Sequence, residues 1–153
     1  MNGQYPLTHS DTLRARIDLT LTEDLDSPGY RRDLASVDDE LPPEVVHAVL
    51  NYRMLDPYAI GITFSYGDCP GVDWVCARDL FRGGLTEPTG SGDVRIRPAG
   101  DRIVIELLSP TGYASLSADR GEIADFVDRM YRAVPDGSEN AWFFLDQELQ
   151  LLS

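Results

Sequence analysis

Apolar and polar residues alternate without interruption between Thr12 and Thr22. A period of two places every second side chain on the same side of an extended backbone, whereas a helix cannot keep such a set on one face. The pattern therefore predicts a β-strand with one buried and one solvated face. The apolar face is expected to hold Leu13, Ala15, Ile17, Leu19 and Leu21.

Six further segments have the composition of strands, and turns that contain Gly, Pro or Asp separate most of them. Their expected ranges are 45–53, 60–66, 72–77, 93–97, 102–108 and 113–117. Short connections between successive strands indicate hairpins, and hairpins pair their strands antiparallel. The chain is therefore expected to contain about seven antiparallel strands.

Helical signals are concentrated after the fourth strand. Residues 78–82 are predicted to form a short helix that ends at Gly83-Gly84. Asp119 and Glu122 have the spacing of a capping box, and apolar residues then recur with a helical period. A last helix is expected at 146–152. Strands first and helices late are typical of the α+β class.

Two parts of the chain have no regular period. Residues 1–11 are expected to be a tail, and residues 23–43, which are rich in Asp and Glu, a long acidic loop. Residues 12–153 are expected to form a single domain around one hydrophobic core. The expected core contains Leu13, Ile17, Ile62, Phe64, Ile103, Ile105, Phe126 and Met130.

The charge of the chain restricts what it can bind. Its formal net charge is −13, and its 13 basic residues are all Arg. A phosphate backbone needs clustered cations, so nucleic acid is not the expected partner. The absence of Lys excludes Schiff-base and P-loop chemistry. No apolar run could span a bilayer and the first residues do not form a signal peptide, so we expect a cytoplasmic protein without membrane insertion.

Candidates for catalysis or metal binding are few. Cys69 and Cys76 do not have the spacing of a zinc site, and His9 and His47 are remote from each other. Cys69 and His47 could form a catalytic pair, but a turn cysteine beside a half-exposed histidine is the preferred interpretation. Gly90-Ser91-Gly92 lacks the third glycine of a dinucleotide loop. We therefore predict no catalytic residue, metal or cofactor.

Two groups of residues have a second interpretation. Arg95 and Arg97 lie on one strand face with Arg102 nearby, so they could form a platform for single-stranded nucleic acid, although a solvated surface is preferred. Trp142-Phe143-Phe144 is expected to pack in the core or, alternatively, to form a subunit interface, where aromatic residues are enriched.

Four short motifs follow one another in the last two thirds of the chain. They are Asp56-Pro57-Tyr58-Ala59, WVCARDL from Trp74, PTGSGDVR from Pro88 and FLDQEL from Phe144. In this order they resemble the SsgA-like proteins, a family of actinomycete cell-division regulators tied to sporulation. The resemblance runs from about Leu50 to Leu152, whereas the acidic loop 23–43 departs from the family pattern.

The resemblance implies a non-catalytic regulator or adaptor of sporulation-specific cell division that acts at the septum through protein contacts. The implied partners are the tubulin-like GTPase FtsZ or other SsgA-like proteins, and the implied state is a homo-oligomer, most simply a trimer. The implied fold is similar to Whirly-type domains, in which two antiparallel sheets pack with C-terminal helices. Relatives of that fold bind single-stranded nucleic acid, which is the alternative function.

The expected contact surface lies around Gly83-Gly84 and the loop 86–92, because loops held by a rigid sheet often carry binding residues. The predicted contact residues are Arg78, Asp79, Arg82, Thr89, Ser91, Arg95 and Arg97. Alternatively, Arg78 and Asp79 pair with each other or cap the short helix.

Overall fold

The structure is a computed structural model of the 153-residue chain, and it describes residues 11–22, 45–68, 71–110 and 112–140. The described residues form seven strands and two helices. In chain order they are β1 (Thr12–Leu21), β2 (Val45–Arg53), β3 (Ala59–Ser65), β4 (Val72–Ala77), α2 (Arg78–Gly84), β5 (Val94–Ala99), β6 (Arg102–Ser109), β7 (Gly112–Asp119) and α3 (Arg120–Ala133).

The seven strands form one antiparallel sheet in the order β4-β3-β2-β1-β7-β6-β5. This confirms the predicted α+β class with antiparallel strands. Where two sheets were predicted, however, the structure has one, because the end of β1 pairs with β7 and joins the two halves. The joining ladder is short: Thr20 lies opposite Ser117 and Leu21 opposite Leu116. The likeness to Whirly-type domains stays a prediction.

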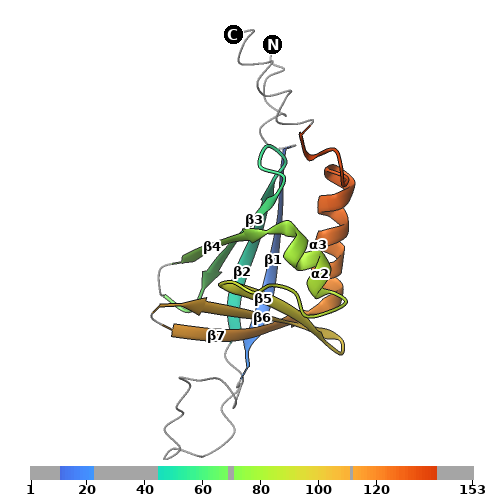
Figure 1. Cartoon of the computed structure of the whole chain (residues 1–153). Coiled ribbons are helices and arrows are strands. Elements are labelled where there is room, and N and C mark those ends of the chain that lie inside the picture. The colour runs from blue at the N-terminus through green and yellow to red at the C-terminus, as the bar shows by residue number, and fades with distance from the viewer. Residues whose placement is uncertain (1–10, 23–44, 69–70, 111, 141–153) are drawn as a thin grey trace, which may run out of the picture.

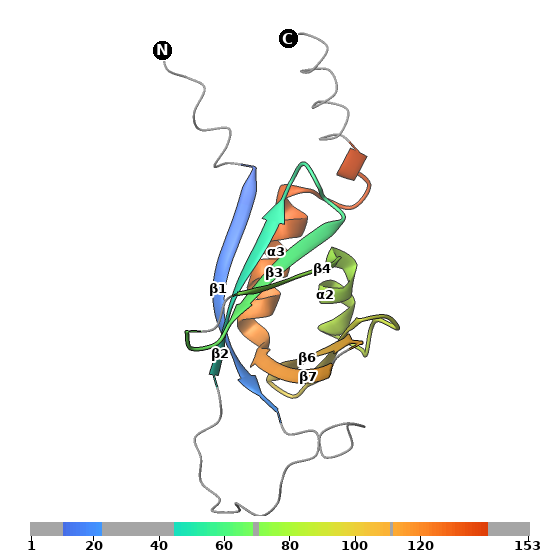
Figure 2. The ribbon, with the colours of Figure 1, turned by 90° about the vertical axis from the view of Figure 1, so that its left-hand side faces the viewer.

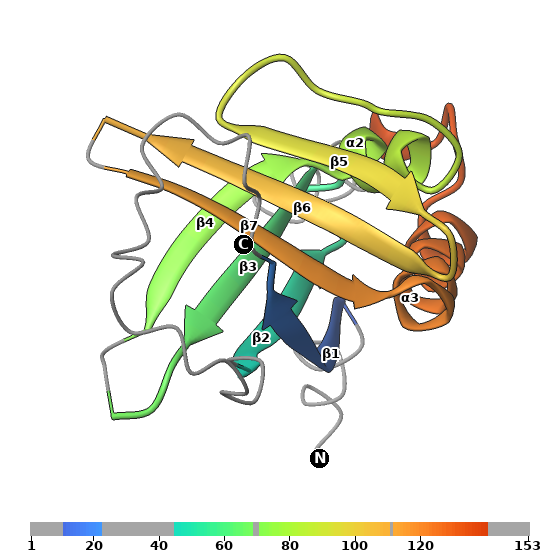
Figure 3. The ribbon, with the colours of Figure 1, turned by 90° about the horizontal axis from the view of Figure 1, so that it is seen from below.

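The sheet is strongly curled. β1, β2 and β3 run along the long direction of the molecule, and β5, β6 and β7 run across them (Figure 1). Helices α2 and α3 lie inside the bend (Figure 2), and the view from below shows the strands of the two halves crossing (Figure 3). α3 packs against β1, β6 and β7, whereas α2 packs against β4, β5 and α3. The helices therefore cover the concave face of the sheet.

The hydrophobic core fills the space between this concave face and the helices. Seven of the eight predicted core residues are buried there, and Leu13 is partly buried against them. The alternation predicted for β1 is confirmed, since Ile17 and Leu19 are buried while Arg16 and Asp18 are exposed. The core side chains that the helices contribute are Phe81, Ile123, Phe126, Val127 and Met130.

Two glycines allow α2 to lie directly on its neighbours. A Cβ atom added to Gly84 would lie 2.3 Å from Cγ2 of Ile96 in β5, and one added to Gly83 would lie 2.6 Å from Oγ1 of Thr89. These distances are shorter than any real Cβ contact, so side chains at both positions would push the helix away. The helix also ends later than predicted. Residues 78–82 were expected, whereas both glycines belong to the last turn of α2.

α3 begins where the capping pattern predicted. The Asp119 carboxylate accepts a hydrogen bond of 2.9 Å from the Glu122 N–H, which satisfies a backbone group that the helix itself leaves unpaired. The acidic loop 23–43, the last helix and the aromatic block that begins at Trp142 lie outside the described residues. The same holds for the predicted tail, except Asp11.

Candidate protein-contact site

The first residue of α2, Arg78, lies in the interior of the protein. Its side chain is 1% exposed. Its guanidinium donates to the Tyr52 hydroxyl (3.0 Å), the Val134 carbonyl (2.7 Å) and the Glu139 carboxylate (3.0 Å). Charge-assisted bonds of this kind compensate for the removal of a cation from water. Arg78 therefore links β2 and α2 to the turn after α3.

Tyr131 of α3 lies against two arginines of α2. The guanidinium carbons of Arg78 and Arg82 lie 4.0 Å and 4.2 Å from the centre of its ring. Its hydroxyl donates to the Asp79 carboxylate, and Arg82 in turn binds Asp136. Burial and the neighbouring Asp79 raise the pKa of Tyr131. The two helices are thus joined by a charged and aromatic cluster.

This cluster corrects the prediction for Arg78. A buried guanidinium whose donors are used inside the protein presents no atoms to a partner, so Arg78 supports the surface without belonging to it. Asp79 and Arg82 do lie at the surface, with exposed fractions of 71% and 45%, and their charged groups are 3.7 Å apart. The predicted Arg78–Asp79 pair and side-chain cap do not form, since Glu139 takes the place of Asp79 and α2 has no side-chain cap.

The partners of Arg78 were not predicted from the sequence. Tyr52 and Tyr131 carry the right chemistry, but they are 26 and 53 positions away from Arg78, on different elements. No local pattern in the sequence identifies these partners, because they lie far from Arg78 along the chain.

The loop before β5 is held by backbone bonds. Thr89 and Ile96 exchange two hydrogen bonds, of 2.8 Å and 2.9 Å, so the loop covers the outer edge of β5. Gly90 follows with φ of 106°, a conformation that favours glycine, and a Cβ there would lie 2.5 Å from the Val94 carbonyl oxygen. Ser91 is exposed at the tip. The predicted contact residues Thr89 and Ser91 thus lie on a loop that backbone bonds hold against the edge of β5.

The three arginines of the predicted nucleic-acid platform do not act as a group. Arg97 is paired with Glu106 at 3.3 Å, and Arg102 donates to the backbone and side-chain oxygens of Ser117 at 2.9 Å and 3.0 Å. Arg95 is exposed, and no hydrogen bond to another described residue is seen for its side chain. Two of the three cations are therefore already engaged by the protein.

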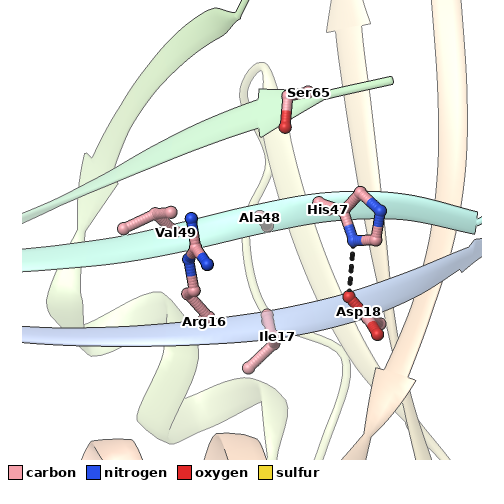
Figure 4. A pocket seen from close by; sticks show the side chains of 7 residues that line it. All are labelled: Arg16, Ile17, Asp18, His47, Ala48, Val49 and Ser65. Carbon is pink, nitrogen blue, oxygen red and sulfur yellow. Dashed lines mark hydrogen bonds and ion pairs between the residues drawn. The ribbon is translucent and has the colours of Figure 1, made fainter. Parts of the chain in front are cut away.

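A shallow hollow of about 410 Å³ lies on the opposite, convex face of the sheet. Arg16 and Asp18 of β1, His47 and Val49 of β2 and Ser65 of β3 line it (Figure 4). Asp18, His47 and Ser65 form a row across the three strands. The hollow is open to solvent, because its polar side chains stand on the surface of the sheet.

Asp18, His47 and Ser65 are the residue types of a hydrolytic triad, but they are not arranged as a triad. His47 Nδ1 lies 2.7 Å from Asp18 Oδ1, and both side chains are more than half exposed. A nucleophile must also bond to the histidine, and no hydrogen bond joins His47 to Ser65, both of which are described. An exposed contact of this kind contributes little to stability.

The structure gives no support to cysteine chemistry at the positions it describes. Burial raises the pKa of the Cys76 thiol to about 12, so the reactive thiolate is scarce at neutral pH. Cys69, the candidate partner of His47, lies outside the described residues. Across the described ranges, no three His, Cys, Asp or Glu side chains are grouped so that they could hold a metal ion. The helices among those residues are also too short or too polar to cross a membrane.

The fold and the site define an α+β domain, in which a curled sheet and a buried Arg–Tyr cluster support a charged surface of α2 and the adjacent loop. The chain belongs to the SsgA family: a family model described as Streptomyces sporulation and cell division protein, SsgA, matches residues 46–139. The matched range contains every predicted contact residue.

Named relatives agree with this assignment. The chain is 45% identical over 116 residues to the sporulation-specific cell division protein SsgB of Saccharopolyspora erythraea, which covers 74% of this chain and 82% of that protein. It is also 45% identical over 124 residues to SsgB of Streptomyces coelicolor, covering 78% of this chain and 88% of the relative.

Solved structures show the same fold. The SsgA-like sporulation-specific cell division protein of Thermobifida fusca superposes with a TM-score of 0.74 at 31% identity, over 93% of this chain and 96% of that one. A structure from work on SsgB mutations and longitudinal cell division in Streptomyces coelicolor gives a TM-score of 0.69 at 35% identity, over 86% and 94%. The protein is thus a member of a family of sporulation and cell-division proteins.

Proposed function

We propose that this protein is a non-catalytic regulator of sporulation-specific cell division, which acts as a cytoplasmic adaptor at the septum through contacts with other proteins. The observation that carries the proposal is family membership, since the relatives that match most of the chain are named sporulation-specific cell division proteins. The proposed partners are FtsZ or another SsgA-like protein, and the proposed state is a homo-oligomer, most simply a trimer.

The contact surface that we propose combines α2 with the loop before β5. Asp79, Arg82, Ser91 and Arg95 are exposed there, and Thr89 anchors the loop through its two backbone bonds to Ile96. Because the backbone of the loop is already held by these bonds, it loses little conformational freedom when a partner binds.

Localisation and partner capture test the proposal together. A fluorescent fusion should concentrate at sporulation septa, and a pull-down from the same cells should recover a division protein. Diffuse fluorescence throughout division, with no division protein recovered, would refute the adaptor function. Light scattering coupled to gel filtration should show an oligomer, and a monomer at micromolar concentration would refute the trimer.

A charge reversal tests the surface itself. Arg95→Glu should weaken septal localisation, because Arg95 is exposed and the described residues do not engage its side chain. Arg132→Glu is the matched control: Arg132 is also exposed but lies on α3, where its neighbour is Asp128. Equal loss in both variants would indicate an effect of net charge alone. Salt-sensitive binding of single-stranded oligonucleotides by the wild-type protein would instead favour the nucleic-acid alternative.

A further inference from the structure

The two edges of the sheet are built differently. At β5, the loop residue Thr89 occupies the backbone N–H and C=O of Ile96, and Arg95, Arg97 and Pro98 lie along the strand. Bound loops, charges and proline are the devices that keep an edge strand from pairing with another chain. At β4 no other described segment pairs with the outer edge, and the register with β3 runs from Val72 to Ala77 without a bulge.

The backbone groups that β4 turns outward can be assigned. The Arg78 N–H donates to the Tyr58 carbonyl at 2.9 Å, so this pair is hydrogen-bonded. Bonded and non-bonded pairs alternate in an antiparallel ladder. Asp73, Val75 and Ala77 are therefore the residues whose N–H and C=O groups point away from β3, toward the free edge.

The side chains at this edge are apolar and incompletely covered. Val75 is 70% exposed on the convex face and Val72 55% exposed at the start of the strand. Trp74 and Cys76, on the concave face, are only partly buried against the core. β4 lies at the margin of the sheet (Figure 1), so a further strand would cover both faces of its edge. Burial of apolar surface would add to the backbone hydrogen bonds.

We infer that the edge of β4 binds an extended, alternately apolar segment of another protein that carries basic residues, and that this segment adds an eighth strand. The charge around the edge selects this occupant. Asp73 is the charged residue of β4, and Asp68 is exposed in the preceding turn. A segment with basic residues gains from attraction to these two carboxylates. The inference rests on the proposed function, because it supplies a mode of contact for an adaptor.

A peptide selection tests the inference without knowledge of the natural partner. A phage-displayed library of random short peptides is selected on the full chain, and the enriched peptides are synthesised. We expect alternating apolar residues with Arg or Lys, and binding that weakens with salt. Hydrogen–deuterium exchange should show new protection at the amides of Asp73, Val75 and Ala77.

Three variants separate an edge contact from a general effect. Val75→Pro removes an outward N–H but no bond to β3, and Val75→Arg charges the edge. Each should weaken peptide binding about tenfold or more. Val45→Arg is the control for Val75→Arg. Val45 is also an exposed valine but lies on β2, and both substitutions add one positive charge. Circular dichroism confirms that each variant is folded.

Several results would overturn the inference. They are enriched peptides that are acidic, protection confined to amides outside β4, equal loss of binding in Val45→Arg, or no enrichment at all. Protection of the β4 edge that rises with protein concentration in the absence of peptide would assign the edge to a second copy, and would also overturn it. Septal localisation of the wild-type fusion tests the proposed function separately, so failure of the peptide selection alone would leave that function standing.

Discussion

The guanidinium carbon of Arg78 lies 4.0 Å from the centre of the Tyr131 ring. Arg78 opens α2 and Tyr131 lies near the end of α3, so this stack joins the two helices. The same guanidinium also binds the Val134 carbonyl and the Glu139 carboxylate, so it ties the segment after α3 to α2. One buried cation therefore supports the side of the molecule that carries the proposed contact surface.

Replacement of Arg78 should be among the most destabilising single changes on this side of the protein. Arg78→Ala leaves a buried hydroxyl, a carbonyl and a largely buried carboxylate without their donor, and loss of one partner of a buried pair costs about 3–5 kcal/mol. We expect the lower end of this range, since Glu139 is 15% exposed and can be rehydrated. Urea denaturation measures the change in the free energy of unfolding.

Arg82→Ala provides the matched control for Arg78→Ala. Arg82 also stacks on Tyr131, but it is 45% exposed, and exposed ion pairs are worth at most about 1 kcal/mol. Equal destabilisation by both substitutions would contradict the central role of Arg78. Arg78→Lys should recover only part of the stability, because an ammonium group cannot reproduce the planar fork and the stack.

Gly84→Ala should destabilise the protein although alanine favours helices. The added methyl group would lie 2.3 Å from Ile96 Cγ2, and overpacking of this kind costs about 1–3 kcal/mol. Gly92→Ala is the control, since a Cβ at Gly92 meets no atom within 4 Å. Thermal unfolding should show a lower Tm for Gly84→Ala alone. An unchanged Tm would mean that α2 can move away from β5 without cost.

Stability should fall in alkaline solution. Burial raises the pKa values of Tyr52, Tyr131 and Cys76 above their ordinary values of 10.0, 10.0 and 9.0. The unfolded chain then loses these protons at lower pH than the folded chain. The stabilising contribution is therefore complete below pH 9.0 and is lost as the pH rises toward the folded pKa values. Denaturant titrations across this range should show a decline that is smaller in Tyr131→Phe than in Tyr66→Phe, an exposed control. A flat profile would contradict the burial of these groups.

Cys76 should react slowly with alkylating reagents. Its pKa of about 12 keeps it in the thiol form, and its side chain is partly covered by the core. In a Cys69→Ser background, iodoacetamide should modify Cys76 much more slowly in the folded protein than in denaturant. Equal rates in the two conditions would show that β4 does not protect this thiol.

The strands of this protein could be read from the sequence. The ranges predicted for β2 and β4 agree with the structure at both ends, and the buried face of β1 is the predicted one. These features depend on neighbouring residues, since the pleat places alternate side chains on opposite faces and Gly or Pro residues end the strands. The capping of α3 by Asp119 is local in the same sense.

The curl into one sheet and the burial of Arg78 were decided by the tertiary structure. The two halves of the sheet are joined by contacts such as Thr20 with Ser117, and Arg78 meets Glu139 across 61 positions of sequence. The local sequence does not show which distant residue an arginine will contact. An exposed arginine that could bind a partner and a buried arginine can therefore lie in the same kind of sequence. The sequence by itself determined where the strands lie and which face each one buries, because side-chain alternation acts residue by residue. Which charges remain at the surface depended on how the folded sheet brings distant segments together.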